Sequence, residues 1–143
     1  MVKHPKGDRQ YAVLPWRIGD SGKREIMLLT SRETRRWVIP KGWPIKGKKP
    51  AQTAAQEAYE EAGLVGEIVG KRPIGTYHYT KRTKHGDLLC EVRVYLLLVE
   101  KQLEDWPERQ QRVTAWFDAA RAAELVNDGA LALIIASFAG IQW

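Results

Sequence analysis

The stretch QEAYEEAGL at residues 56–64 follows the glycine and proline loop PKGWP at residues 40–44. Residues 51–62 are rich in Ala, Gln and Glu, which favour a helix, and Gly63 stands where a helix would stop. On that helix Glu57, Glu60 and Glu61 are spaced i, i+3 and i+4, so they fall within about 100° of arc on one face. Carboxylates gathered in this way repel one another by a few tenths of a kcal/mol per pair. A positive partner is therefore expected, and a divalent metal ion is the leading candidate.

Length and composition indicate one globular domain. The chain has 143 residues, of which 44% are hydrophobic and 28% charged. The longest uncharged apolar run, Ala130 to Ile141, is too short to cross a bilayer, and the first residues lack the apolar segment of a secretory signal. We expect a flexible N-terminal tail over residues 1–8 and a single domain over residues 9–143.

The charge and the cysteine content restrict the partners and the compartment. The formal net charge is +6, and much of the excess lies in two regions: Lys46, Lys48 and Lys49, and then Lys71-Arg72, Lys81-Arg82 and Lys84-His85. This excess favours an anionic partner such as a polyphosphate, a nucleotide or nucleic acid, although a solvated basic surface would look the same. The single cysteine, Cys90, is interpreted as a core thiol in a reducing compartment, which predicts a cytoplasmic protein. No association with a membrane is expected, because the longest apolar run is too short to span one.

Hydrophobic patterning predicts an alternation of strands and helices. Proline, glycine and Asn-Asp-Gly segments separate the elements. Strands are expected at residues 10–18, 25–30, 37–39, 64–69, 72–83, 88–99 and 113–117, and helices at 51–62, 119–126 and 131–139. The loop from Lys41 to Pro50 leads into the first helix, with Pro50 suited to its first turn. The simplest architecture is a mixed sheet with helices on its faces.

The loop and helix together resemble the signature of the Nudix hydrolases, G-x5-E-x7-R-E-U-x-E-E-x-G-U, where U is apolar. The 23-residue span matches in length, and these positions match in type: Gly42, Glu57, Ala58, Glu60, Glu61, Gly63 and Leu64. The resemblance implies an α/β fold, a Nudix-like α/β/α sandwich with a mixed central β-sheet.

Two signature positions depart from that pattern. Lys48 stands where the family usually has Glu, and Gln56 stands where it usually has Arg. In the family those two side chains are thought to brace the loop against the helix. One interpretation is an altered brace with intact metal carboxylates, and the other is a weakened or altered active site. The first is favoured because the glutamates that carry the chemistry are all present.

The resemblance also implies a metal-dependent mechanism. Glu57 and Glu61, with the main-chain carbonyl of Lys41, are expected to bind Mg²⁺, with Mn²⁺ as an alternative. Such a metal would neutralise diphosphate oxygens and activate a water. Glu57 and Glu60 are the expected catalytic residues, with Glu60 as general base. A later loop carboxylate can join the site in some relatives. Glu100, Glu104 and Glu108 are candidates here, and the sequence does not choose among them.

The outer motifs resemble the diphosphoinositol polyphosphate phosphohydrolases, which also cleave diadenosine polyphosphates. The motifs that carry this resemblance are Trp37 to Gly42, Leu103 to Trp106, Arg112 and Trp116-Phe117. It implies phosphate contacts from Arg9, Ser31, Arg32 and Arg112. Trp43 is the best candidate to touch a base or an inositol ring.

The expected function is Mg²⁺-dependent hydrolysis of a diphosphate linkage in a highly anionic small molecule. Diphosphoinositol polyphosphates and dinucleoside polyphosphates are the leading substrates. Two alternatives remain open: a pyrophosphohydrolase acting on RNA 5′ ends, and a catalytically silent domain that binds a nucleotide or RNA. The physiological substrate and the oligomeric state do not follow from the sequence.

Overall fold

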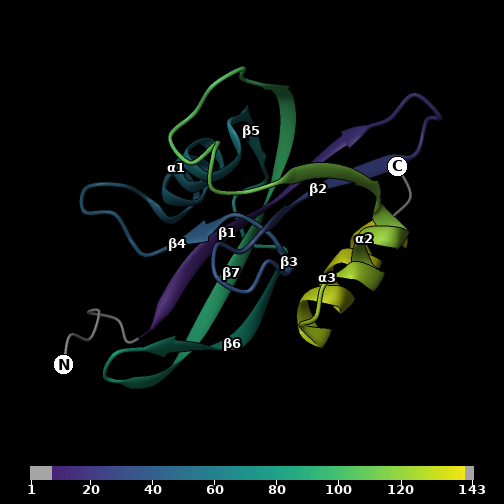
Figure 1. The fold of residues 1–143 in the computed structure, drawn as a ribbon. Coiled ribbons are helices and arrows are strands. Elements are labelled where there is room, and N and C mark those ends of the chain that lie inside the picture. The colour runs from purple at the N-terminus through teal and green to yellow at the C-terminus, as the bar shows by residue number, and fades with distance from the viewer. Residues whose placement is uncertain (1–7, 141–143) are drawn as a thin grey trace.

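Eight strands form one mixed sheet in the computed structural model, which describes residues 8–140 (Figure 1). The strands are β1 (Arg9–Ile18), β2 (Arg24–Thr30), β3 (Trp37–Val38), β4 (Lys41–Gly42), β5 (Leu64–Val69), β6 (Gly75–Thr83), β7 (Gly86–Gln102) and β8 (Thr114–Asp118). The helices are α1 (Pro50–Ala62), α2 (Ala119–Leu125) and α3 (Gly129–Gly140). The tail predicted for residues 1–8 lies almost entirely outside the described residues.

The centre of the sheet is the parallel pair of β1 and β7. Its register runs from Arg9 opposite Glu91 to Trp16 opposite Leu98. The main path of the sheet is β3-β2-β1-β7-β5, while β4 pairs with β1, β6 with β7 and β8 with β2. Because neighbours cover both of its faces, β1 is buried over most of its length, and its sequence is correspondingly a nearly continuous apolar run.

Side chains of β1 alternate between two apolar layers. Tyr11 and Val13 pack with the buried alanines of α1, whereas Ala12 and Leu14 pack with α2 and α3 on the opposite face. Figure 1 shows α1 on one side of the sheet and the two C-terminal helices on the other. The predicted α/β/α sandwich with a mixed central sheet is therefore confirmed.

Three elements differ most from their predicted boundaries, and in the first two the pairing between strands decides the element. Residues Lys41–Gly42, predicted as loop, form β4 by pairing with Tyr11 and Ala12 of β1. β7 is longer than the predicted 88–99, since it continues into the hairpin with β6 at one end and pairs with β5 at the other. β6 begins at Gly75 rather than residue 72, and Pro73, which has no N–H to donate, lies in the excluded segment.

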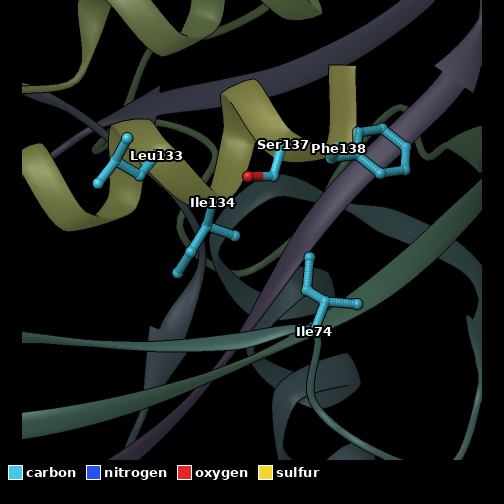
Figure 2. A pocket seen from close by; sticks show the side chains of 5 residues that line it. All are labelled: Ile74, Leu133, Ile134, Ser137 and Phe138. Atoms are coloured by element: carbon cyan, nitrogen blue, oxygen red, sulfur yellow. The ribbon is translucent and has the colours of Figure 1, made fainter. Parts of the chain in front are cut away.

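α3 is apolar around its whole circumference and covers only part of the sheet. Leu131, Ile135 and Phe138 are buried in the core, whereas Leu133 is 70% exposed. A shallow pocket of about 200 Å³ opens beside it, lined by Ile74, Leu133, Ile134, Ser137 and Phe138 (Figure 2). No carboxylate or cation lines this pocket, so the chemistry predicted from the sequence lies elsewhere. Among the described residues, no helix is long and apolar enough to cross a membrane.

The connection between β7 and β8 is fastened to the C-terminal end of α1, over which it arches in Figure 1. A helix leaves its last carbonyls without partners inside the helix. Here the Glu108 N–H donates to the Glu60 carbonyl (3.0 Å), and the Leu103 N–H donates to the Gly63 carbonyl (2.8 Å). The Gln102 side-chain amide donates to the Ala62 carbonyl at 2.9 Å. This connection therefore caps α1 and is held in a fixed place beside it.

Two separate features of this junction require glycine at position 63. Its φ of +67° is left-handed, and a Cβ at this position would lie 2.3 Å from the Trp106 ring. Gly63→Ala should therefore lower the free energy of unfolding by about 2–4 kcal/mol, from backbone strain together with displacement of the indole. Urea unfolding would measure this.

Gly70→Ala is the matched control, because Gly70 also has a positive φ, +86°, and its Cβ would meet no atom within 4 Å. We expect this change to cost only about 1 kcal/mol of backbone strain. Equal losses in the two variants would contradict a role for the Trp106 contact.

Candidate active site

The acidic face lies on α1. Pro50 is its first residue, and the Gln52 side-chain oxygen accepts a hydrogen bond from the Lys49 N–H at 2.9 Å, which secures the N-terminal end. Glu61 is 7% exposed, while Glu57 and Glu60 are half-buried. The helix thus presents the three predicted carboxylates together, and one of them is withdrawn from water.

Gly42 makes room for Glu57. A Cβ on Gly42 would lie 2.3 Å from the carboxyl carbon of Glu57 and 2.5 Å from one of its oxygens. The Lys41 carbonyl is bonded directly to the Gly42 nitrogen, so it belongs to the same small region. The glycine of the signature therefore has a steric reason in this structure, because the absence of a side chain lets a carboxylate approach the backbone of β4.

A buried arginine joins the acidic face to the β7–β8 connection. The Arg112 guanidinium lies 3.9 Å from a Glu61 oxygen and 2.9 Å from a Glu108 oxygen. It also donates to the Thr30 carbonyl at 3.2 Å. Of the three loop carboxylates considered from the sequence, the structure brings Glu108 to the cluster, whereas Glu100 and Glu104 are exposed.

The cations around the cluster do not offset the effect of burial on its carboxylates. Burial raises the pKa of Glu61 to about 8, even though Arg112 and Lys41 act in the opposite direction. Burial and the neighbouring Glu60 charge also raise the pKa of Glu57. Both shifts mean that the ionised form is disfavoured where it stands. A divalent cation at this position would favour ionisation of both groups.

The donor set suits Mg²⁺ or Mn²⁺. Within residues 8–140, no three Asp, Glu, His or Cys side chains are arranged so that they alone could hold a metal ion. Mg²⁺ does not require such a cage, because it commonly uses one or two carboxylates and completes its shell with water and phosphate oxygens. Glu57, Glu61 and the Lys41 carbonyl can supply the protein's share.

The Lys41 side chain adds a cation that was not predicted, since only its carbonyl was assigned a role. Its ammonium lies 5.0 Å from the centre of the Tyr79 ring, and the Tyr79 hydroxyl donates to Gln10 at 2.7 Å. Burial lowers the pKa of Lys41, as do the nearby charges of Lys81 and Arg112, while Glu61 raises it. Lys41 therefore lies beside the acidic cluster, and Lys81 lies near Lys41. A phosphate group bound next to Lys41 would favour the charged form of its ammonium.

The two positions that depart from the signature behave differently. The Gln56 amide donates to a Glu60 carboxylate oxygen at 2.7 Å, a bond within α1 rather than between the helix and the loop. Lys48 is exposed and takes part in no ion pair within the described part of the chain. The interpretation of an altered brace with intact carboxylates stays a prediction.

The other predicted substrate residues are distributed around this region, and most already have partners. Arg9 pairs with Glu91 at 3.0 Å. Ser31 bonds to the Thr34 hydroxyl and accepts from the Arg36 N–H. Arg32 donates to the Gln111 side chain at 3.1 Å, next to Arg112.

Trp43 is half-buried in the loop that follows β4. Arg112 is the one predicted phosphate contact that lies inside the acidic cluster, where it contacts two carboxylates. Substrate contacts from these residues stay predictions.

Comparison with known proteins points to one family. Residues 8–136 match the family model described as "NUDIX domain". A relative from Arabidopsis thaliana, "Nudix hydrolase 12, mitochondrial", is 33% identical over 107 residues, covering 72% of this chain and 52% of the relative. The human "Diphosphoinositol polyphosphate phosphohydrolase 3-alpha" is 31% identical over 106 residues, covering 72% of this chain and 60% of that protein. The chain thus spans only about half to three-fifths of these two relatives.

Solved structures support the fold. The Caenorhabditis elegans structure "Ap4A Hydrolase Binary Complex" aligns with a TM-score of 0.67 at 19% identity, covering 92% of this chain and 94% of that one. The NUDIX domain of Shewanella oneidensis NrtR, complexed with ADP ribose, aligns with a TM-score of 0.68 at 15% identity, covering 92% and 88%. At such identities the likeness concerns the fold alone.

Arg112 should be a large contributor to stability. Its side chain and that of Glu61 are each 9% exposed, and removing one partner of a buried pair typically costs about 3–5 kcal/mol. We expect Arg112→Met to lower the free energy of unfolding by about 2–4 kcal/mol in metal-free buffer. Arg109→Met is the control, because Arg109 is 50% exposed and pairs with an exposed Asp105. It should cost less than about 1 kcal/mol, and similar losses in both variants would contradict the assignment.

Gly42→Ala should impair metal binding more than folding. The added methyl meets the mobile end of Glu57 rather than backbone, so the carboxylate can move aside at little cost to the fold. We expect the stabilisation by Mg²⁺, measured by thermal unfolding, to indicate at least about tenfold weaker binding. Gly47→Ala, in the loop that follows β4, is the control for metal binding, because its Cβ would meet nothing within 4 Å. Its φ of +83° should lower stability by about 1 kcal/mol and leave the Mg²⁺ response unchanged. An unchanged Mg²⁺ response in Gly42→Ala would refute the role of this close approach.

Proposed function

The chain belongs to the NUDIX family, and from this membership we propose that it hydrolyses a diphosphate linkage in a highly anionic small molecule with the help of Mg²⁺ or Mn²⁺. The observation that carries the proposal is the acidic face of α1, where Glu57 lies against Gly42 and Glu61 contacts Arg112. The reaction would be cleavage of an acid anhydride by water.

Each residue of the acidic face has a separate role in the proposed reaction. Glu57, Glu61 and the Lys41 carbonyl would hold the cation, whose part is to neutralise diphosphate oxygens and make a bound water more acidic. Glu60 would accept the proton of the attacking water, because its side chain is half-buried, beside Glu57 and oriented by Gln56. Arg112 would keep Glu61 and Glu108 in place.

Charge at the margin of the cluster favours a polyphosphate substrate. Lys41 interacts electrostatically with Glu61 of the acidic cluster and with Lys81. Lys46, Lys48 and Lys49 are exposed in the loop after β4. One similar protein is described as a diphosphoinositol polyphosphate phosphohydrolase and a structural neighbour as an Ap4A hydrolase. We therefore propose diphosphoinositol polyphosphates and dinucleoside polyphosphates as the first compounds to test.

RNA with a 5′-triphosphate is the second candidate substrate. The hairpin between β6 and β7 exposes Lys81, Arg82, Lys84 and His85, a run of basic side chains that could follow a nucleic-acid backbone. The proposed location is the cytoplasm, supported by the buried free thiol of Cys90. The names of several relatives state that those proteins are mitochondrial.

A panel of diphosphate compounds with Mg²⁺ or with EDTA tests the proposal. Diadenosine tetraphosphate, a diphosphoinositol pentakisphosphate and 5′-triphosphate RNA would be compared. We expect turnover with Mg²⁺, none with EDTA, and a fall of at least about 100-fold in kcat for Glu57→Gln and Glu60→Gln. Glu67→Gln, which removes an exposed carboxylate on β5, should leave kcat within about twofold.

The other outcomes separate the alternatives. Turnover that persists in EDTA and in Glu60→Gln would contradict the mechanism. Tight binding of one compound without turnover of any would instead favour a catalytically silent binding domain.

A further inference from the structure

The Thr53 side chain carries a buried hydroxyl without a hydrogen-bond partner. Thr53 lies on α1 and is 0% exposed, and within residues 8–140 no group bonds to its Oγ1 atom. A threonine in a helix often donates to the carbonyl four residues earlier, but here only the backbone N–H of Thr53 bonds to the Lys49 carbonyl, at 2.9 Å. A buried hydroxyl without a partner is destabilising, and native proteins contain few of them. This hydroxyl therefore calls for a partner that the folded chain alone does not supply.

Thr53 lies on the acidic face of α1. It precedes Glu57 by one turn, and at about 100° per residue the two side chains differ in direction by about 40°. Helical side chains lean toward the N-terminus of their helix, so the Glu57 carboxylate extends over the turn that carries Thr53. The close approach of that carboxylate to Gly42 keeps it against the backbone of β4. The hydroxyl and the carboxylate are therefore neighbours on one face of the helix.

Among the described residues, Glu57 is the carboxylate of the acidic face that no amide or cation holds. Glu60 accepts from the Gln56 amide at 2.7 Å, and Glu61 faces the Arg112 guanidinium at 3.9 Å. Glu57 contacts the Glu61 carboxyl, which leaves other acceptor positions on its oxygens, because an ionised carboxylate can accept about four hydrogen bonds. An unused donor and an unfilled acceptor thus lie one helical turn apart.

We propose that Thr53 is a positioning residue of the metal site, whose hydroxyl donates to the Glu57 carboxylate when a divalent cation is bound. The hydrogen bond holds the carboxylate in place while it binds the cation. Groups that hold a metal ligand in this way commonly contribute about 10–100-fold to metal affinity. Residue 53 is one of the seven unspecified positions between Lys48 and Gln56 in the family signature, so the signature assigns it no role. The inference rests on the cation-binding part of the proposed function.

Three substitutions separate the hydroxyl from the volume of the side chain. Thr53→Val removes the hydroxyl and keeps a β-branched side chain of nearly the same shape. Thr53→Ser keeps the hydroxyl and removes the methyl group. Thr76→Val is the matched control, because Thr76 is an exposed residue of β6 to which the proposal gives no role.

The melting temperature of the metal-free protein, measured in EDTA, is the first readout. We expect Thr53→Val to raise this temperature by about 2–4 °C, because it removes a buried hydroxyl that has no partner. Thr53→Ser should lower it, because the missing methyl group leaves a small void. If the hydroxyl instead had a purely structural role, Thr53→Val would lower the melting temperature.

Mn²⁺ binding to the purified protein, measured by titration calorimetry, is the second readout. We expect Thr53→Val to weaken Mn²⁺ binding about tenfold. Thr53→Ser and Thr76→Val should both stay within about twofold of the unaltered protein. The more stable variant would thus be the weaker metal binder, a combination that a general loosening of the fold does not produce.

Double-mutant cycles show whether the hydroxyl acts through Glu57. In the Glu57→Gln background, Thr53→Val should change the Mn²⁺ affinity by less than about twofold. In the Glu61→Gln background the tenfold effect should persist, because the structure places Arg112 rather than Thr53 against Glu61.

Four results would overturn the inference. A lower melting temperature of metal-free Thr53→Val would show that the hydroxyl already has a partner. Equal Mn²⁺ affinities in Thr53→Val and Thr76→Val would exclude a part in metal binding, and a tenfold effect that persists beside Glu57→Gln would exclude action through Glu57. Absence of Mn²⁺ binding by the unaltered protein would also refute the inference. Failure of the proposed catalytic function is distinguishable, because a protein that turns over no diphosphate compound can still show this pattern of Mn²⁺ affinities.

Discussion

The buried guanidinium of Arg112 is the constraint on which the acidic face depends. Carboxylates withdrawn from water and placed beside one another favour protonation or separation. Arg112 opposes this by contacting Glu61 and Glu108 while donating to the Thr30 carbonyl at the end of β2. One side chain therefore joins a helix, a connection and a strand at the point where the negative charge is greatest.

Two glycines make this arrangement sterically feasible. Gly42 lets the Glu57 carboxylate lie against β4, and Gly63 lets the Trp106 ring lie against the end of α1. The Trp106 contact has a consequence two residues later, because it fixes the connection whose Glu108 N–H caps α1. The spacing between glycines and glutamates in the sequence thus reflects two close contacts, one at Glu57 in the middle of α1 and one at its C-terminal end.

The sequence predicted what local spacing determines. Glu57, Glu60 and Glu61 share a helix face because of the periodicity of the helix alone, and the long apolar run of β7 is recognisable without its partners. The sequence could not show that Glu108, rather than Glu100 or Glu104, joins the cluster. The position of Glu108 depends on the contact of Trp106 with Gly63, which is far away in the chain. β4 was missed for the same reason: a two-residue strand exists only through its pairing with β1.

Positive charge was harder to interpret than negative charge. The sequence shows how many arginines are present but not which carboxylate each one contacts. In the structure Arg9 and Arg112, both predicted to bind phosphate, contact carboxylates of the protein. The cations beside the cluster instead include Lys41, from the backbone segment already assigned to metal binding. Under the proposed function this arrangement favours an order of events. The carboxylates of the acidic face would repel a polyphosphate until a dication is bound, and the basic residues nearby would hold the substrate afterwards. If the proposal holds, the net positive charge of the chain and the acidic face of α1 would serve different partners, the phosphate chain and the metal ion.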